Sequence, residues 1–426
     1  MSEIIIHAES AKKASRILAC LDSDKKNSAL LLIATRLLEN KESIFEANKK
    51  DLQKAEEDNL PDPVKKRLKF DETKLDDVVS GIKSLIGLED PVNKVLLHTE
   101  LADGLELYRV TCSIGVLGII FESRPDALVQ IASLALKSGN GVILKGGSEA
   151  SNTNTILASV IYDAGIEAGL PEGWLYLIKA RSEVTEMLSL NQYIDLIIPR
   201  GSNEFVQYIM KNTTIAVLGH ADGVCSTYID DEADEDLAIK VAVDAKTQYV
   251  SVCNATEKFL VNRNLGFDFI DRLINTLKEN HVEIFGDDEI CARYGCEKAP
   301  EWHHEYLDYK VTVKLVDNME EAVDHINTYG SGHTESIITK NLEKAEKFMA
   351  SVDSGNVMHN CSTRFSDGFR YGFGAEVGVS TSKLHARGPV GLEGLVSYKY
   401  KVYGHGDIVK DFAEKKRQFT HKKFDI

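Results

Sequence analysis

The sequence has few of the features that mark fibrous, disordered, secreted or membrane proteins. Its 8 prolines and 30 glycines are dispersed among 426 residues, and no internal repeat, low-complexity tract or flexible linker stands out. The N-terminus lacks the basic segment of a signal peptide, and the apolar runs are too short to cross a membrane. With 43% hydrophobic residues, the sequence predicts a globular cytoplasmic protein of two or more domains.

The chain also has fewer basic than acidic residues. The 66 acidic residues outnumber the 50 lysines and arginines, which gives a formal net charge of -16. A general attraction to nucleic acid or to an anionic membrane is therefore not expected. Any anionic substrate must be met by a local cluster of basic residues.

The cysteines argue against disulfides. There are seven of them, an odd number, with no C-x-x-C pair, so free thiols are expected. Cys291 and Cys296 precede Trp302, His303 and His304, but this spacing fits no common zinc pattern. No metal site is predicted.

Short apolar runs alternate with amphipathic stretches over residues 113–218. Strands are predicted at 113–121, 141–146, 174–178, 194–199 and 215–218, and helices at 127–137, 149–168, 182–190 and 203–210. Helical patterns over 7–38 and 41–59 come before them. This alternation predicts a parallel sheet covered by helices.

The second half repeats the alternation after an acidic run at 230–236. Helices are predicted at 233–246, 267–279 and 320–329, and strands at 258–261, 311–315 and 336–339. Two α/β domains of unequal size follow. Residues 105–110 and 395–403 alternate like exposed strands, which pair either with another subunit or as ordinary hairpins.

Neither a Walker motif nor a G-x-G-x-x-G fingerprint occurs, so a nucleotide needs another loop. One candidate is the glycine turn that follows Lys145, where Gly146 and Ser148 open a helix whose N-terminus can face phosphate. Ser148 can either cap that helix or touch the ligand. The second candidate runs through Arg200, Gly201 and Ser202, although an ordinary capped turn explains it as well.

Cys253 is the candidate nucleophile, in a polar stretch at 246–257. On position alone it is one of seven cysteines, and an inert buried thiol is the alternative.

Taken together, these segments resemble the gamma-glutamyl phosphate reductase family of the aldehyde dehydrogenase superfamily. The resemblance runs in order over nearly the whole chain. The matching strings lie at 121–125 (F-E-S-R-P), 137–150, 197–201, 220–223 (H-A-D-G), 252–255 (V-C-N-A), 329–335, 361–368 and 374–393. The chain departs from the family pattern at Tyr249 and Val250, where Arg-Pro is usual, and at Cys361, where alanine is frequent.

The resemblance implies an aldehyde dehydrogenase-like α/β fold, with two Rossmann-type three-layer domains and a small β oligomerisation flap. The cofactor-binding domain is expected at 1–225, interrupted by a flap strand near 96–111. The catalytic domain with the nucleophilic cysteine is expected at 226–385. Residues 386–426 are expected to form a C-terminal return segment and the oligomerisation strand.

The implied activity is the NADPH-dependent reduction of L-glutamyl 5-phosphate to L-glutamate 5-semialdehyde and phosphate. It is the second step of proline biosynthesis from glutamate, and it proceeds through a thioester on Cys253 because a thiolate both expels phosphate and holds the acyl group. Asn254 and Asn360 are candidate amide donors to the carbonyl oxygen, beside the backbone N–H of Cys253.

Further roles follow from the matching strings. The cationic residues expected to bind the substrate are Arg124, Arg364, Lys383, His385 and Arg387, each of which could instead form a salt bridge. Glu305 is expected to hold the nicotinamide ribose, with a strand-edge acid as the alternative. His220 stands where hydrolytic relatives carry a water-activating glutamate.

Other interpretations remain open. A hydrolytic or CoA-acylating aldehyde dehydrogenase shares the thiol chemistry, and a non-catalytic binding protein shares the scaffold. A homo-oligomer is expected, and glutamate 5-kinase is a candidate transient partner.

Overall fold

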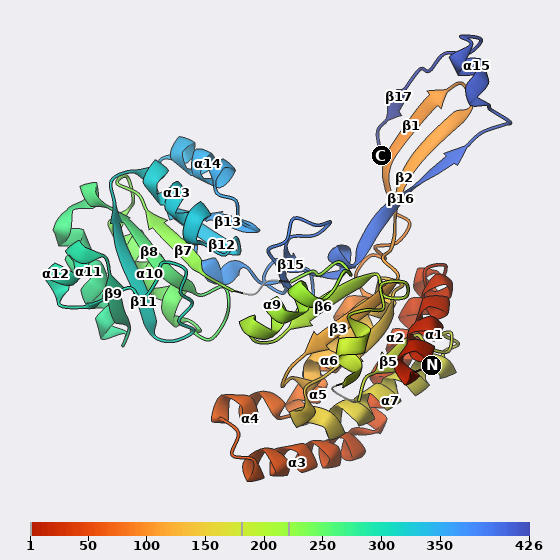
Figure 1. Ribbon diagram of the computed structural model, residues 1–426, viewed down its shortest axis with the longest axis horizontal. Helices are drawn as coiled ribbons and strands as arrows, with labels where there is room; N and C mark the ends of the chain where they lie inside the picture. Colours follow the sequence, from red (N-terminus) through yellow and green to blue (C-terminus); the bar gives the residue numbers. More distant parts are fainter. Residues whose placement is uncertain (1, 180–181, 220–221) are drawn as a thin grey trace.

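The computed structural model describes residues 2–179, 182–219 and 222–426. The chain forms two α/β units and a narrow four-stranded flap that projects from the first unit (Figure 1). Among the described residues, no helix is both long and apolar enough to span a membrane.

The first unit opens with helices. Asp22 and Asp71 cap two of them by accepting the backbone N–H groups of Lys25 and Lys74. The helices of this segment are α1 (Glu3–Leu18), α2 (Ser23–Glu39), α3 (Lys41–Glu57), α4 (Asp62–Leu68) and α5 (Glu72–Ile86). The opening helical pattern is thus divided among separate helices.

The first sheet is parallel, with strand order β5-β4-β3-β6. Its strands are β3 (Val116–Phe121), β4 (Gly141–Lys145), β5 (Leu175–Leu177) and β6 (Leu196–Arg200). Its crossover elements are α6 (Pro125–Lys137), η1 (Ser148–Ala150), α7 (Ser151–Glu167), α8 (Ser182–Met187) and α9 (Asn203–Asn212). The strand predicted at 215–218 is reduced to one bridge, between Ile197 and Val217.

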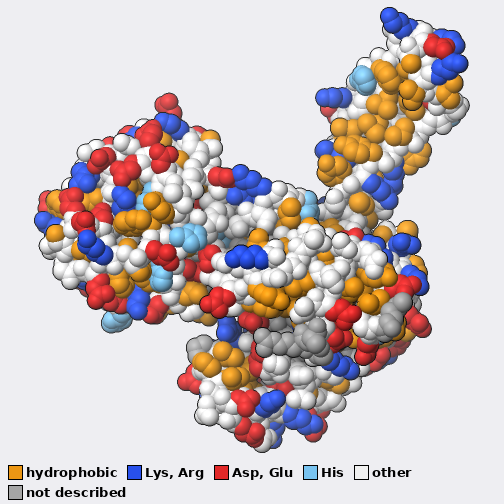
Figure 2. Space-filling model, viewed as in Figure 1, with side chains coloured by type: hydrophobic (Ala, Val, Ile, Leu, Met, Phe, Trp, Pro, Cys, Tyr) orange, Lys and Arg blue, Asp and Glu red, His pale blue; other side chains and the backbone are white. Residues whose placement is uncertain are grey.

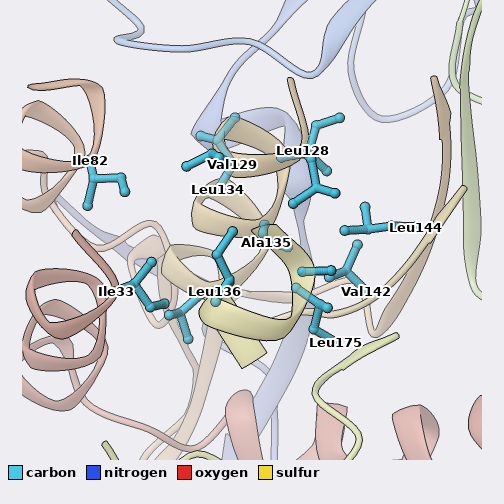
Figure 3. Close-up of a cluster of buried hydrophobic side chains, with 14 of the residues drawn as sticks. Ile33, Ile82, Leu128, Val129, Leu134, Ala135, Leu136, Val142, Leu144 and Leu175 are labelled. Carbon is cyan, nitrogen blue, oxygen red and sulfur yellow. The ribbon is translucent and has the colours of Figure 1, made fainter. Parts of the chain in front are cut away.

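Apolar residues bury both faces of this sheet. Alternate residues of β3 point to opposite faces: Leu117 and Ile119 pack with α6 and α7, whereas Ile120 packs with Ile4 of α1. Figure 3 shows part of the first cluster, in which Leu144 lies beside helix α6. The burial of both faces explains why these strands are continuous apolar runs.

The second unit contains a seven-stranded sheet with order β10-β9-β11-β8-β7-β12-β13, in which every pairing is parallel. Its strands are β7 (Cys225–Ile229), β8 (Thr256–Asn262), β9 (Glu283–Gly286), β10 (Glu297–Lys298), β11 (Lys310–Val316), β12 (Thr334–Ile338) and β13 (Asn356–His359). Its helices are α10 (Glu235–Thr247), η2 (Arg263–Leu265), α11 (Gly266–Glu279), α12 (Asp288–Tyr294), α13 (Met319–Tyr329) and α14 (Leu342–Ser351).

The flap is an antiparallel sheet of order β16-β2-β1-β17. It consists of β1 (Val95–Ala102), β2 (Leu105–Ser113), β16 (Val396–Tyr403) and β17 (Lys422–Phe424), with the short helix α15 (Val409–Ala413) at its tip. Both segments predicted to be exposed strands are present, and within the chain they pair with each other, from Val396 with Ser113 to Tyr403 with Glu106.

A return segment at 360–395 connects the second unit to the flap. It holds η3 (Thr363–Phe365), β14 (Gly378–Ser380), β15 (Gly388–Val390) and η4 (Leu392–Leu395). Val377, Val390 and Leu395 belong to the core of the first unit, so the return segment packs against that unit. The sheet of the second unit begins along the chain with β7 at Cys225.

Candidate active site

Cys253 lies in the loop that joins α10 to β8, and its side chain is partly exposed. Gly223 lies directly against the backbone of this loop. A Cβ at position 223 would come within 2.3 Å of the Cys253 carbonyl oxygen and 2.5 Å of its Cα. Glycine is therefore required where the segment before β7 meets the Cys253 loop.

A buried ion pair joins the two ends of the same loop. Lys246 in the last turn of α10 and Glu257 in β8 are both fully buried, with Nζ and Oε2 2.8 Å apart. The other oxygen of Glu257 accepts the backbone N–H of Leu307, at 3.4 Å. Burial raises the pKa of Glu257 to about 7 and lowers the pKa of Lys246. One carboxyl group thus holds both the Cys253 loop and the segment around Leu307.

Two other thiols of the second half of the chain, those of Cys225 and Cys361, are less suited to nucleophilic attack. Cys225 is fully buried and its Sγ donates to the Cys253 carbonyl oxygen, 3.1 Å away. Burial raises the pKa of Cys225 well above its ordinary value, and it also raises the pKa of Cys361. Of these three cysteines, only Cys253 lines the cleft described next.

The cleft beside Cys253 has a volume of about 390 Å³ and is lined by both units. The first unit contributes Ile198, Gly201 and Val206, from the end of β6 and from α9. The second unit contributes Cys253 and Leu307. The thiol therefore faces the carboxyl end of the first sheet across a shared space.

Four arginines line this cleft: Arg67, Arg124, Arg200 and Arg364. Arg124 is paired with Asp126, at 3.0 Å, and the buried Arg364 donates from Nε to Gln248 Oε1, also at 3.0 Å. Burial lowers the pKa of Arg200 and of Arg364, with Arg124 adding to the effect at Arg200. An arginine stays protonated despite such shifts, so four positive charges line the cleft, together with the carboxyl groups of Glu305, Asp367 and Glu376.

The structure does not bring the other predicted substrate residues into this cleft. Lys383 and Arg387 both bind Asp353, at 2.5 Å and 2.9 Å. His385 contacts the carbonyl oxygen of Gly394 through Nε2, at 2.9 Å. Of the five cationic residues expected to bind substrate, Arg124 and Arg364 are gathered near Cys253 and these three are not.

The two predicted amide donors have partners within the protein. Asn254 lines the cleft, but its Nδ2 donates to the Ser366 carbonyl oxygen, at 2.6 Å. Asn360 spans the backbone of Thr339, accepting its N–H and donating to its carbonyl oxygen. The Asn360 amide therefore fixes the ends of β12 and β13, and this geometry leaves the backbone N–H of Cys253 as the better candidate for the oxyanion.

The predicted cofactor residues meet at one edge of the first sheet. In the register of β3 with its neighbours, Ile120 lies beside Lys145 and Phe121 lies beside Arg200. Because these strands are parallel, the turns that follow Lys145 and Arg200 start at the same edge. Gly146, Ser148, Gly201 and Ser202 therefore come close together at this edge.

The helices that start at this edge differ in how their N-termini are satisfied. Asp51 caps α7: its carboxylate accepts the backbone N–H groups of Asn152 and Thr153, at 3.1 Å and 2.8 Å. Helix α9 begins at Asn203, and the side chain of its N-cap residue Ser202 makes no capping hydrogen bond. At α9 the Glu122 carboxylate accepts the backbone N–H of Ser202, but no side chain caps the first turn, whereas Asp51 already caps α7.

Glu305 reaches across the cleft. Its Oε2 accepts a hydrogen bond from Nδ2 of Asn203 in the first turn of α9, at 2.9 Å, and the same amide donates to Asp222, at 2.6 Å. Glu305 thus lies next to the first turn of α9. His220 lies outside the described residues.

One acidic group among the described residues has the spacing of a metal site, formed by Asp230, Asp231 and Glu232. Lys344 Nζ lies within 3.2 Å of a carboxylate oxygen of each. A lysine ammonium group thus already binds all three carboxylates and offsets part of their negative charge.

Several residues of the site were not singled out from the sequence. Arg67 comes from a basic run in an otherwise acidic chain, which was the only available signal. Lys246 and Glu257 flank the Cys253 string, but only the structure shows that they bind each other. Asn203 and Asp51 act through contacts with residues 102 and 101 positions away.

Two parallel α/β sheets, an arginine-lined cleft between them and a thiol at its edge define an aldehyde dehydrogenase-type enzyme. Residues 2–289 and 311–398 match the Aldehyde dehydrogenase family. The chain is 60% identical to the gamma-glutamyl phosphate reductase of Acetivibrio thermocellus over 97% of its own length and 96% of the relative's.

Solved structures agree with this assignment. The crystal structure of gamma-glutamyl phosphate reductase from Thermotoga maritima superposes with a TM-score of 0.93 at 38% identity, covering 96% of this chain and 100% of that one. The glyceraldehyde-3-phosphate dehydrogenase of Methanocaldococcus jannaschii, complexed with NADP, shares the fold at 18% identity and a TM-score of 0.66, over 95% and 94% of the chains. The chain therefore belongs to the aldehyde dehydrogenase family and, within it, to the gamma-glutamyl phosphate reductases, which confirms the predicted fold class.

Proposed function

We propose that this protein reduces L-glutamyl 5-phosphate to L-glutamate 5-semialdehyde and phosphate with NADPH, the second step of proline biosynthesis from glutamate. The observation that carries the proposal is Cys253, placed at the edge of a cleft that four arginines line. The relatives that match nearly the whole chain at 58–60% identity bear the name of this activity.

Cys253 is the nucleophile in this proposal. Its thiolate attacks the γ-carbonyl carbon, the bond from that carbon to the phosphate oxygen breaks, and the acyl group remains on sulfur as a thioester. Phosphate leaves with the electron pair of the broken bond. The backbone N–H of Cys253 stabilises the negative charge that develops on the carbonyl oxygen.

The arginines bind the two anionic ends of the substrate. Arg364 is buried beside the Cys253 loop and is suited to the departing phosphate, because a guanidinium binds phosphate oxygens in pairs. Arg124 and Arg67 lie farther into the first unit and are suited to the α-carboxylate. Lys383, His385 and Arg387 have no direct role in this proposal.

The residues at the first sheet's edge fit a dinucleotide. Helix α9 has no side-chain cap at its N-terminus, where backbone N–H groups can bind phosphate. Lys145, Arg200 and Ser202 would hold the phosphates and Glu305 the ribose next to the nicotinamide. When bound, NADPH supplies the hydride that converts the acyl group to the aldehyde.

The proposal also includes a homo-oligomer, a cytoplasmic location and a transient encounter with glutamate 5-kinase. Support for the oligomer comes from the flap, where Tyr398, Tyr400 and Val402 are more than half exposed. Figure 2 shows hydrophobic side chains over the visible face of the flap. Its edge strand β16 pairs on one side with β2, and the chain provides no strand for its other side among the described residues.

The test is the reaction in reverse, with semialdehyde, phosphate and NADP⁺, followed by the absorbance of NADPH. NADPH formation that requires phosphate supports the proposal. Formation that requires CoA instead, or neither acceptor, would identify an acylating or a hydrolytic aldehyde dehydrogenase.

Cys253→Ala should lose all but roughly a thousandth of the activity while keeping its far-UV circular dichroism, because nothing else can form the thioester. A variant that keeps a tenth of the activity would contradict the role of Cys253.

A further inference from the structure

The second unit holds a pair of thiols that the proposed reaction does not use. Cys291 lies in α12 and Cys296 lies just before β10, and both are partly exposed. Cys296 donates to Cys291, with the two sulfur atoms 3.0 Å apart. A disulfide bond is about 2.05 Å long, so the sulfurs are within roughly 1 Å of bonding distance.

Local backbone structure brings the two residues together. Helix α12 ends at Gly295, which adopts a left-handed conformation with φ of 66° and donates its N–H to the Cys291 carbonyl oxygen, at 2.9 Å. This C-cap reverses the chain immediately before Cys296. The geometry needs glycine at position 295, since other residues rarely adopt this φ.

The flanking contacts hold each half of the turn separately. On one side, Arg293 and Tyr294 both bind Asp271 of α11, at 2.9 Å and 2.5 Å. On the other side, β10 pairs with β9 directly after Cys296. The sulfurs are therefore held near each other by these contacts and by the Cys291 thiol, which donates to the carbonyl oxygen of Glu297 at 3.1 Å.

We propose that Cys291 and Cys296 are a site of reversible disulfide formation with small disulfides such as oxidised glutathione. Cys291 attacks one sulfur of oxidised glutathione, which releases one glutathione thiolate and leaves a mixed disulfide. Cys296 then attacks the Cys291 sulfur and releases the second glutathione. Two protein thiols are oxidised to one disulfide, one oxidised glutathione is reduced to two thiols, and the two protons pass to the released thiolates.

The order of attack follows from the hydrogen bond. Burial, together with donation to Cys291, raises the pKa of the Cys296 thiol to about 12. Cys296 therefore keeps its proton until the second step, when Cys291 is already bound to glutathione and the internal attack needs little movement.

This site is distinct from Cys253. The thiol pair follows β9, which lies two strands from β8 in the order β9-β11-β8, and it lies beyond the carboxyl end of β9. Cys253 precedes β8 instead. The proposal does not depend on the proposed function and can be tested without measuring turnover.

The test uses the full-length protein equilibrated with mixtures of oxidised and reduced glutathione, quenched with acid and alkylated. Trypsin cleaves after Arg293, between the two cysteines, so a disulfide joins the peptides 279–293 and 294–298. We expect Cys291 and Cys296 to lose alkylation in equal measure as oxidised glutathione increases. The joined peptides should appear in mass spectra and disappear after reduction.

Exposed Cys20 serves as the reference thiol in the same digests. It should carry a glutathione mixed disulfide and join no other peptide of its own chain. Cys296→Ser should leave Cys291 with bound glutathione and should abolish the joined peptides. If Cys291 and Cys296 stay alkylated, or each carries its own glutathione, under conditions that modify Cys20, the proposal is overturned.

Discussion

The sheets of the two α/β units place their charged residues differently. In the first unit, the strands β3, β4, β5 and β6, all of whose residues the structure describes, carry charge only where β4 and β6 end, at Lys145 and Arg200. In the second unit, β8 and β12 are buried throughout, yet they contain Glu257, Lys258 and Glu335.

The two units therefore supply charged groups to the site in different ways. The first unit buries apolar strands and presents charge at the sheet's edge, where a ligand can neutralise it. The second unit buries charged groups that must find partners within the protein, since an unpaired buried charge is costly. Lys246 and Glu257 show the result, because their pair fixes the loop that carries Cys253.

The largest effect should follow from removing one charge of that pair. Lys246→Met leaves Glu257 buried without its partner, which should lower the free energy of unfolding by about 3–5 kcal/mol. The loss should be greater near pH 8 than near pH 6. Burial raises the pKa of the Glu257 carboxyl group to about 7 although Lys246 lowers it, so without Lys246 the folded variant keeps this proton to higher pH than the wild type does, and its stability continues to fall as pH rises. Urea unfolding at both pH values measures the change.

The double variant Lys246→Met, Glu257→Met is the control, since it removes both charges. It should be more stable than the single variant. A double-mutant cycle then gives the coupling energy between Lys246 and Glu257. Equal losses in the single and double variants would show that packing, and not charge, fixes the loop.

In the sheet of the first unit, a core substitution should lower the free energy of unfolding through lost packing, and this loss should not depend on pH. Leu144 is fully buried in β4 and lies in the cluster of Figure 3. Leu144→Ala should cost about 3 kcal/mol through lost burial and the cavity that remains. The cost should be the same near pH 6 and pH 8. If the loss of stability in Leu144→Ala depended on pH, the two units would not differ in their response to pH.

Buried His325 of the second unit should make stability fall on acidification. Burial, with a contribution from Lys258, lowers the pKa of His325 to about 3, and its Nε2 accepts from Lys258 Nζ at 3.2 Å. The unfolded chain takes up this proton near pH 6.5 and the folded chain does not, so stability is lost as pH falls from about 6.5 toward 3. Between pH 7 and pH 5 this amounts to about 2 kcal/mol.

His325→Gln keeps an oxygen that can accept from Lys258 but cannot titrate. The variant should lose about 2 kcal/mol less than the wild type between pH 7 and pH 5 in urea unfolding. Identical losses in the two proteins would mean that His325 is protonated in the folded state.

The sequence predicted those parts of the fold that depend on neighbouring residues. The strands β3 and β4 were predicted because burial on both faces makes them continuous apolar runs. The pairing of β16 with β2 was not, because it joins residues almost 300 positions apart and leaves no local pattern. The short strand β9, with an exposed first residue, also lacks a distinctive pattern.

The candidate site shows the same limit. The matching strings at 361–368 and 374–393 made Arg364 and Arg387 candidate substrate ligands, but they could not show which residue each arginine would bind. In the structure, Arg387 binds Asp353, whereas Arg364 lines the cleft. Likewise, the glycine turn after Lys145 correctly indicated a helix start, but the cap comes from Asp51, which lies on a separate helix.

The smallest effect should come from the two helix N-termini at the first sheet's edge, which the sequence could not tell apart. Ser202 precedes the uncapped helix α9, whereas Ser148 precedes α7, whose first N–H groups bind Asp51. If the dinucleotide phosphates lie on α9, Ser202→Ala removes a hydrogen bond to a charged group, worth about 1.5 kcal/mol or roughly tenfold in Kd. Ser148→Ala should change Kd by less than about twofold, which is within the usual effect of a surface substitution. Neither variant should alter helix stability much, because neither serine makes a capping hydrogen bond. Fluorescence titration of each variant with NADPH measures both values. A larger effect at Ser148 than at Ser202 would move the phosphates to α7, and it would require Asp51 to release the N–H groups of Asn152 and Thr153 when the dinucleotide binds.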